Sequence, residues 1–220
     1  MAKPILAISK IIEKKYNCTI DVIQGGSRGL YDSLKYAKVG DLYLPGSESY
    51  RKEYLKDGYL KDAVFIGYNK AAIFVQKHNP KKIKNLNSLM RKDVAIALCD
   101  PKSGSIGRMT KNIILSYKDK KFYDDLYNKA VLIGTDSRNL NVMLINKTID
   151  ATINWRATAF WSENKKYIDI IEIDEKYAPK KRLVLNLLSF SKYPKIAKAF
   201  MAYAASKEGK KIMKRYGFLW

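Results

Sequence analysis

Three glycine–serine turns constrain this chain more than any other feature, because each stands between a strand-like run and a helix-like segment. A helix N-terminus offers unpaired N–H groups and the positive end of the helix dipole. Glycine lets the backbone approach a bound group, and serine adds a hydroxyl that can donate to a ligand or cap the helix. Several such turns around one point would hold an anion without a charged side chain. The turns read Gln24-Gly25-Gly26-Ser27-Arg28, Leu44-Pro45-Gly46-Ser47-Glu48 and Lys102-Ser103-Gly104-Ser105-Ile106-Gly107-Arg108.

Short apolar runs alternate with segments of helical periodicity along the chain, which predicts an α/β fold with mainly parallel sheets. Ligands bind open sheets of this kind at the carboxyl ends of the strands, where all three turns lie. We expect a lobe 1 of residues 1–70 plus 187–220, a lobe 2 of residues 71–186, and a ligand cleft between the lobes. The predicted strands are residues 19–23, 41–44, 71–75, 94–98, 130–133, 150–155, 167–173 and 182–188.

The chain is strongly basic, with 42 Lys and Arg against 21 Asp and Glu and a formal net charge of +21. Such a field attracts anions, nucleic acid or an acidic membrane surface. The basic residues are mostly Lys and are spread among many Tyr, Asn and Ile, which is typical of a composition bias with general anion steering. No stripe of clustered Arg and aromatic residues favours nucleic acid. A nucleic-acid binder stays an alternative that predicts a steep loss of affinity with salt.

Residues for catalysis or metal binding are missing from the pattern. His78 is the only histidine and precedes a turn signal, so neither a Ser–His nor a Cys–His pair is expected. Cys18 and Cys99 fall in different predicted lobes, so we expect no structural disulfide, and no Cys/His cluster has metal-ligand spacing. No apolar run approaches the roughly 20 residues that cross a bilayer. Residues 1–6 lack the apolar segment of a secretory signal. The sequence therefore favours a non-enzyme without metal or cofactor.

The order and spacing of these motifs resemble the type II periplasmic solute-binding proteins of ABC importers, most of all the molybdate- and tungstate-binding members. The resemblance covers nearly the whole chain and implies a two-lobed fold in a periplasmic or extracytoplasmic protein. It further implies a monomer, a membrane permease as partner, and a tetrahedral oxyanion held by neutral hydrogen bonds. Besides the first and third turns, it rests on residues 40–44, Asp100-Pro101, and residues 135–139, 150–156, 206–209 and 216–218.

The resemblance also suggests roles for individual residues. Ser27 matches a serine that donates from its hydroxyl and its N–H, and Ile106 and Ser137 match positions that donate backbone N–H groups. Trp155 matches a position often filled by a tyrosine, and its indole N–H changes the reach and geometry. The expected ligand-binding residues are Gly26, Ser27, Ser47, Ser103, Gly104, Ser105, Ile106, Ser137, Arg138 and Trp155.

Each of these residues has an ordinary alternative. The serines could serve only as helix caps, and Trp155 could pack in the core. The arginines beside the turns could clamp an acidic ligand or hold a lobe together through ion pairs. They are Arg28, Arg108, Arg138 and Arg156.

The chain departs from the family pattern at one point, and a second family shares the expected architecture. The family normally begins with a strand before its first helix, whereas Met1 here lies almost on a predicted helix, so we expect the first strand to be missing. That loss would expose unpaired sheet edges. The effector-binding domain of a LysR-type transcription regulator shares the two-lobed architecture and is the alternative, although no helix-turn-helix is visible in the sequence.

Overall fold

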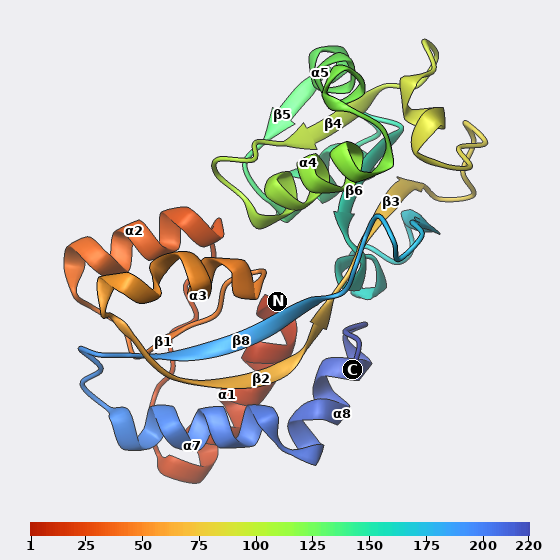
Figure 1. Cartoon of the computed structure of the whole chain (residues 1–220). Helices are drawn as coiled ribbons and strands as arrows, with labels where there is room; N and C mark the ends of the chain where they lie inside the picture. The colour runs from red at the N-terminus through yellow and green to blue at the C-terminus, as the bar shows by residue number, and fades with distance from the viewer. The chain divides into compact units, whose positions relative to one another are not determined.

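The computed structural model describes residues 1–220, and the chain divides between two units. The first unit contains Met1–Asn69 and Lys181–Trp220, and the second contains Lys70–Lys180. Each unit has its own sheet with helices around it (Figure 1). Residues 181–186, expected in lobe 2, instead pair with a strand of the first unit and belong to that unit. No helix combines the length and the apolar character needed to cross a membrane.

The first unit is built on a three-stranded antiparallel sheet in the order β1-β8-β2, from β1 (Leu42–Tyr43), β8 (Lys181–Leu188) and β2 (Leu60–Asn69). Helices α2 and α3 lie on one face of this sheet, and α7 lies on the other (Figure 1). Helices α1 and α8 pack against α7. The bounds are α1 (Ala2–Tyr16), α2 (Ser27–Ala37), α3 (Glu48–Tyr54), η1 (Leu55–Asp57), α7 (Pro194–Ala205) and α8 (Lys207–Arg215).

A cluster of buried tyrosines fills the space beneath α2 and α3. Tyr31, Tyr43, Tyr50 and Tyr54 are each at most 8% exposed and pack with Leu60 and Leu188. The rings of Tyr31 and Tyr54 stack with centroids 3.8 Å apart. Burial of aromatic rings stabilises a core strongly and restricts its geometry, so the cluster packs α2 and α3 against the sheet.

The second unit is built on a five-stranded sheet in the order β5-β4-β6-β3-β7. Strand β4 runs parallel to β5 and β6, while β3 runs antiparallel to β6 and β7. The strands are β3 (Ala71–Gln76), β4 (Ile96–Cys99), β5 (Leu132–Gly134), β6 (Ala151–Trp155) and β7 (Ile168–Glu172). The helices are η2 (Leu86–Met90), α4 (Ser105–Tyr117), α5 (Lys120–Lys129), α6 (Ser137–Ile145) and η3 (Arg156–Phe160).

The predicted α/β class is confirmed, with parallel pairing at β5-β4-β6, where helices connect the strands. The other pairs are antiparallel. Strand β2 leads out of the first unit and β8 leads back into it, so these two strands run in opposite directions.

The strand predicted at residues 19–23 is wrong. Residues 17–26 form neither helix nor strand, and Ile23 is 78% exposed. No strand pairs with this segment, and the nearby β1 is only two residues long. A strand needs a partner for its backbone groups, so the alternating pattern alone does not form one.

Candidate functional site

Three chain segments of the second unit meet around Ser105. Ser105 is the first residue of α4, and its hydroxyl oxygen accepts a hydrogen bond from the Trp155 indole Nε1, 3.1 Å away, at the end of β6. The Ser103 hydroxyl donates to the backbone oxygen of Thr135 at 3.0 Å, which joins the turn before α4 to the turn before α6. The structure thus places four of the predicted residues, including Gly104, within one contact network.

Gly104 is required for this close approach. A Cβ atom there would lie 2.7 Å from Cys99 Sγ and 2.8 Å from the Thr135 carbonyl oxygen. Both distances are shorter than real Cβ contacts, so a side chain would push α4 away from its neighbours. Burial raises the pKa of the Cys99 thiol to about 11, so this cysteine is a packed, unreactive group below the turn.

The first turns of α4 and α6 present backbone donors. No group of the chain accepts the backbone N–H of Ile106 or of Ser137, as expected for the first residues of a helix. Asp136 caps α6 by accepting from the N–H groups of Arg138 and Asn139 at 2.8 and 3.1 Å. Burial works to raise the pKa of Asp136, but the hydrogen bonds from Arg138 and Asn139 lower it.

A buried amide network, which the sequence pattern does not reveal, holds these donors in place. The Asn154 amide donates to the Ser137 carbonyl at 3.0 Å and to Asn141 Oδ1 at 2.8 Å. Its own oxygen accepts the backbone N–H of Trp155 at 2.8 Å. Asn154 is fully buried in β6. The sequence signal that could have revealed the network is an amide side chain near the end of a strand whose residues are all expected to be buried.

The first unit joins its two turns in a similar way. Ser27 is the first residue of α2, and its hydroxyl oxygen accepts the backbone N–H of Gly46 at 3.1 Å. The Tyr43 hydroxyl donates to the Ser27 carbonyl at 2.7 Å. Gly26 is the N-cap residue of α2. Ser47 caps the short helix α3 by accepting the N–H of Ser49 at 3.2 Å, which is its ordinary alternative role.

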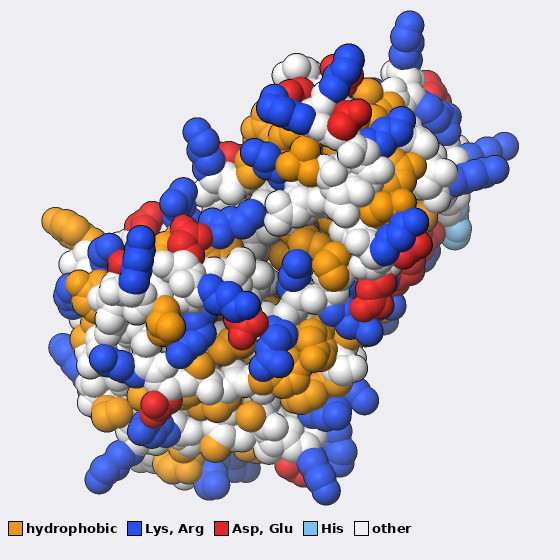
Figure 2. Space-filling view, viewed as in Figure 1, with side chains coloured by type: hydrophobic (Ala, Val, Ile, Leu, Met, Phe, Trp, Pro, Cys, Tyr) orange, Lys and Arg blue, Asp and Glu red, His pale blue; other side chains and the backbone are white.

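Three of the four arginines beside the turns form ion pairs within their own unit. Arg28 lies 3.6 Å from Glu53, Arg138 2.7 Å from Asp136, and Arg156 2.6 Å from Glu172. These pairs give the three arginines their ordinary alternative role, which is to hold parts of one unit together through ion pairs. On the face seen in Figure 2 the Lys and Arg side chains are scattered rather than gathered in one patch.

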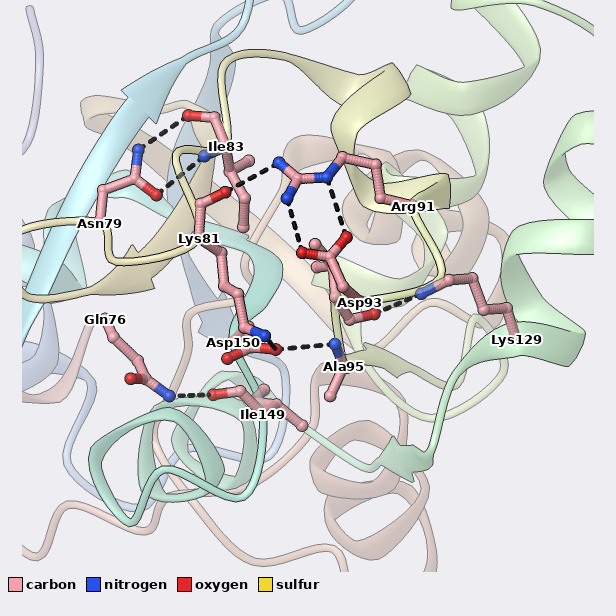
Figure 3. A network of polar contacts seen from close by, with 11 residues as sticks. Gln76, Asn79, Lys81, Ile83, Arg91, Asp93, Ala95, Lys129, Ile149 and Asp150 are labelled. Atoms are coloured by element: carbon pink, nitrogen blue, oxygen red, sulfur yellow. Dashed lines mark hydrogen bonds and ion pairs between the residues drawn. The ribbon is translucent and has the colours of Figure 1, made fainter.

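A second polar network lies at the opposite ends of the same strands (Figure 3). Asp150, which precedes β6, accepts the backbone N–H of Ala95 at 2.8 Å, and Arg91 pairs with Asp93 at 2.6 Å. Lys129 donates to the Val94 carbonyl, and burial lowers its pKa. This network fixes the loop before β4 and contains none of the predicted site residues.

The family of bacterial extracellular solute-binding proteins matches residues 1–219, and the chain belongs to that family. A binding protein of Haemophilus influenzae is 25% identical over 222 residues, covering 100% of this chain and 87% of the relative. A substrate-binding lipoprotein of an ABC transporter from Bacillus subtilis is 26% identical over 216 residues, covering 96% of this chain and 80% of the relative. These homologues are binding proteins, not enzymes, and they do not favour the LysR alternative.

Solved structures confirm the two-lobed periplasmic-binding-protein-like fold. PEB3 with bound L-phospholactate has a TM-score of 0.79 at 21% identity, with 99% of this chain and 94% of that chain covered. The periplasmic molybdate-binding protein of Azotobacter vinelandii has a TM-score of 0.82 at 11% identity, with the same coverage. A periplasmic thiamin-binding protein has a TM-score of 0.82 at 14% identity, covering 99% and 78%.

Proposed function

We propose that this protein is the extracytoplasmic binding protein of an ABC importer and that it captures a small oxyanion. One observation carries the proposal: the serines that begin α2 and α4 each accept a hydrogen bond from within the chain. Ser27 accepts from the Gly46 N–H, and Ser105 accepts from the Trp155 indole, both at 3.1 Å. Each hydroxyl therefore has its proton left to donate.

Backbone groups add to these hydroxyl donors. The N–H groups of Ser27, Ile106 and Ser137 stand in the first turns of their helices without an acceptor in the chain. Helix N-termini carry a partial positive charge that favours anions. In each unit taken by itself these groups are only donors, which suits a ligand whose oxygens carry no proton, such as molybdate, tungstate or sulfate. In this proposal a membrane permease receives the ligand, and the binding protein acts as a monomer outside the cytoplasm.

Related folds leave the ligand class open. The neighbours include proteins described as binding molybdate and L-phospholactate, but also thiamin. The fold alone thus accepts ligands of different charge. The donors of this chain favour an anion, and the size of the ligand is left to experiment.

Thermal unfolding with a panel of anions at constant ionic strength tests the proposal. The panel holds molybdate, tungstate, sulfate, phosphate and L-phospholactate. A ligand at 100 times its Kd stabilises the folded state by about 2.7 kcal/mol, which raises the Tm of a chain of this size by roughly 5–10 °C. A selective shift with one oxyanion supports the proposal. Equal small shifts with every anion would mean general screening of the +21 charge and would overturn it.

A further inference from the structure

We infer that Trp155 is a positioning residue that aims the hydroxyl proton of Ser105 at the ligand, rather than a residue that contacts the ligand through its indole N–H. The inference rests on the proposed function for the ligand, but the contact itself does not. Its basis is the hydrogen bond from Trp155 Nε1 to Ser105 Oγ at 3.1 Å, which joins residues 50 positions apart.

The chemistry of the two groups makes the contact directional. An indole N–H only donates, so it cannot take the proton of the Ser105 hydroxyl. The hydroxyl oxygen accepts from the indole, and no acceptor in the chain binds the hydroxyl proton. The proton is therefore available in the first turn of α4, beside the free backbone N–H of Ile106.

The indole is held firmly enough to serve this purpose. Trp155 is only 5% exposed. Its backbone N–H donates to Asn154 Oδ1 at 2.8 Å, and its carbonyl accepts the Thr158 hydroxyl at 3.0 Å. It also pairs with Ala71 across the sheet. These contacts fix the backbone, and burial in the core cluster holds the ring, so the direction of the N–H is set before a ligand arrives, which is the benefit of preorganisation.

A tyrosine at this position would behave differently. A phenol both donates and accepts, so it could take the Ser105 proton and leave the serine oxygen facing an anion. The indole excludes that state. Trp155→Phe removes the donor and keeps an aromatic ring. Trp155→Tyr introduces a hydroxyl that can donate to Ser105 or accept from it. Comparing Trp, Phe and Tyr at position 155 therefore distinguishes an effect of ring packing from an effect of hydrogen-bond direction.

The contact is tested first without any ligand. In a ¹⁵N–¹H spectrum of the full chain, Trp155→Phe identifies the Trp155 indole resonance among those of Trp161 and Trp220. Ser105→Ala is expected to move that resonance and to leave the other two in place. An unmoved Trp155 resonance in a folded Ser105→Ala protein would overturn the inference, whatever the result of any binding experiment.

A double-mutant cycle then tests the role in binding, with sulfate and molybdate as calorimetric probes. Trp155→Phe and Ser105→Ala are each expected to weaken binding by about fivefold to tenfold. In the Ser105→Ala background, Trp155→Phe should have no further effect, because the group it acts through is gone. Trp161→Phe is the control and should leave the Kd unchanged.

The outcomes separate the inference from the proposed function. Multiplicative losses in the double variant would mean that Trp155 acts independently of Ser105, and would overturn the positioning role while oxyanion binding stands. A wild-type protein that binds neither these probes nor any other anion of the panel would overturn the proposed function. If Trp155→Phe lowers the Tm, its Kd is compared with the Kd of Trp155→Tyr, each measured at the same number of degrees below the Tm of that variant.

Discussion

The Tyr43 hydroxyl donates to the backbone carbonyl of Ser27 across 2.7 Å and joins strand β1 to the first residue of α2. Tyr43 is 3% exposed, and burial of the phenol raises its pKa well above the usual range. The phenol therefore stays protonated and donates at any pH that the protein meets. The contact places the Ser27 hydroxyl and N–H relative to the tyrosine cluster, because α2 and β1 have few other polar links.

Tyr43→Phe should lower the free energy of unfolding by about 1 kcal/mol, since one buried hydrogen bond is lost while the ring remains. The expected fall in Tm is roughly 2–4 °C, measured by thermal unfolding. Tyr36→Phe is the matched control, because Tyr36 lies on α2, the helix that Tyr43 contacts, and is 93% exposed. Equal Tm values for the Tyr43 and Tyr36 variants would contradict a structural role for the contact.

Ser27→Ala and Ser105→Ala should each weaken oxyanion binding by about tenfold, since each removes one hydrogen-bond donor to a charged ligand. Calorimetric titration of each variant tests one unit at a time. Ser162→Ala is the control, because Ser162 is exposed and contacts only Glu163. Normal affinity in both folded variants would show that these turns are not the binding site.

The sequence predicts elements well where the local pattern and the burial agree. The apolar runs at β3, β4 and β6 are buried on both faces of a sheet, so their hydrophobicity identifies them directly. The run at 19–23 shows the limit of this argument. Its alternation is typical of a strand, but whether a neighbouring strand exists is a property of the whole fold.

The sequence pattern does not predict strand β2 or helix α5, and the reasons differ. Strand β2 contains Lys61, Asp62 and Gly67, and its pairing with β8 has register shifts, so no simple alternation marks it. Helix α5 is polar, and its signals are a side-chain cap from Asp119 and ion pairs four residues apart, such as Lys120 with Asp124. Such pairs support a helix without producing an apolar face.

The site was only partly accessible from the sequence. Helix-start residues such as Ser27 and Ser105 follow from local turn chemistry. The Trp155–Ser105 bond and the Asn154 contact to Ser137 join distant positions, and a single sequence does not reveal which distant residues meet. The sequence therefore predicts the donors, while the fold decides what orients them.

The two cysteines should differ sharply in reactivity. Burial raises the pKa of Cys99 to about 11, and Cys99 is 2% exposed, whereas Cys18 is partly exposed. The thiolate is the reacting form, so a disulfide reagent at pH 8 should modify one thiol in the native protein and two after unfolding. Cys18→Ser should abolish the native reaction. Two thiols reacting at equal rates in the native wild type would contradict the packed position of Cys99.

Asp136 should make a pH-dependent contribution to stability. Burial works to raise the pKa of Asp136, but the hydrogen bonds from Arg138 and Asn139 outweigh it and hold the folded-state pKa below the usual value of 3.8. A lowered folded pKa stabilises the native state above the unfolded pKa, and this stabilisation is lost as the pH falls through the folded pKa. Below about pH 4, unfolding free energies of wild type and Asp136→Asn should therefore converge.

Chemical denaturation between pH 2 and 7 measures this difference. Asp32→Asn is the control, since Asp32 is an exposed carboxylate on α2 without an ion pair. At pH 7 the free energy of unfolding of Asp32→Asn should match that of the wild type within about 0.5 kcal/mol. A difference between wild type and Asp136→Asn that stays constant down to pH 2 would show that the Asp136 carboxylate does not titrate as this cap requires.

Two glycine-to-alanine changes should act in opposite directions. At Gly104 a Cβ atom would meet Cys99 Sγ at 2.7 Å and the Thr135 carbonyl at 2.8 Å, so Gly104→Ala should destabilise by about 1–3 kcal/mol. At Gly29 in α2 a Cβ atom meets nothing within 4 Å, so Gly29→Ala should stabilise by about 0.5–1 kcal/mol through helix propensity. Denaturant titration of both variants measures the pair. Because the Gly104 clash displaces the start of α4, Gly104→Ala should also weaken oxyanion binding, whereas a stable Gly104→Ala protein with unchanged Kd would contradict the packing of α4 against the turn before α6.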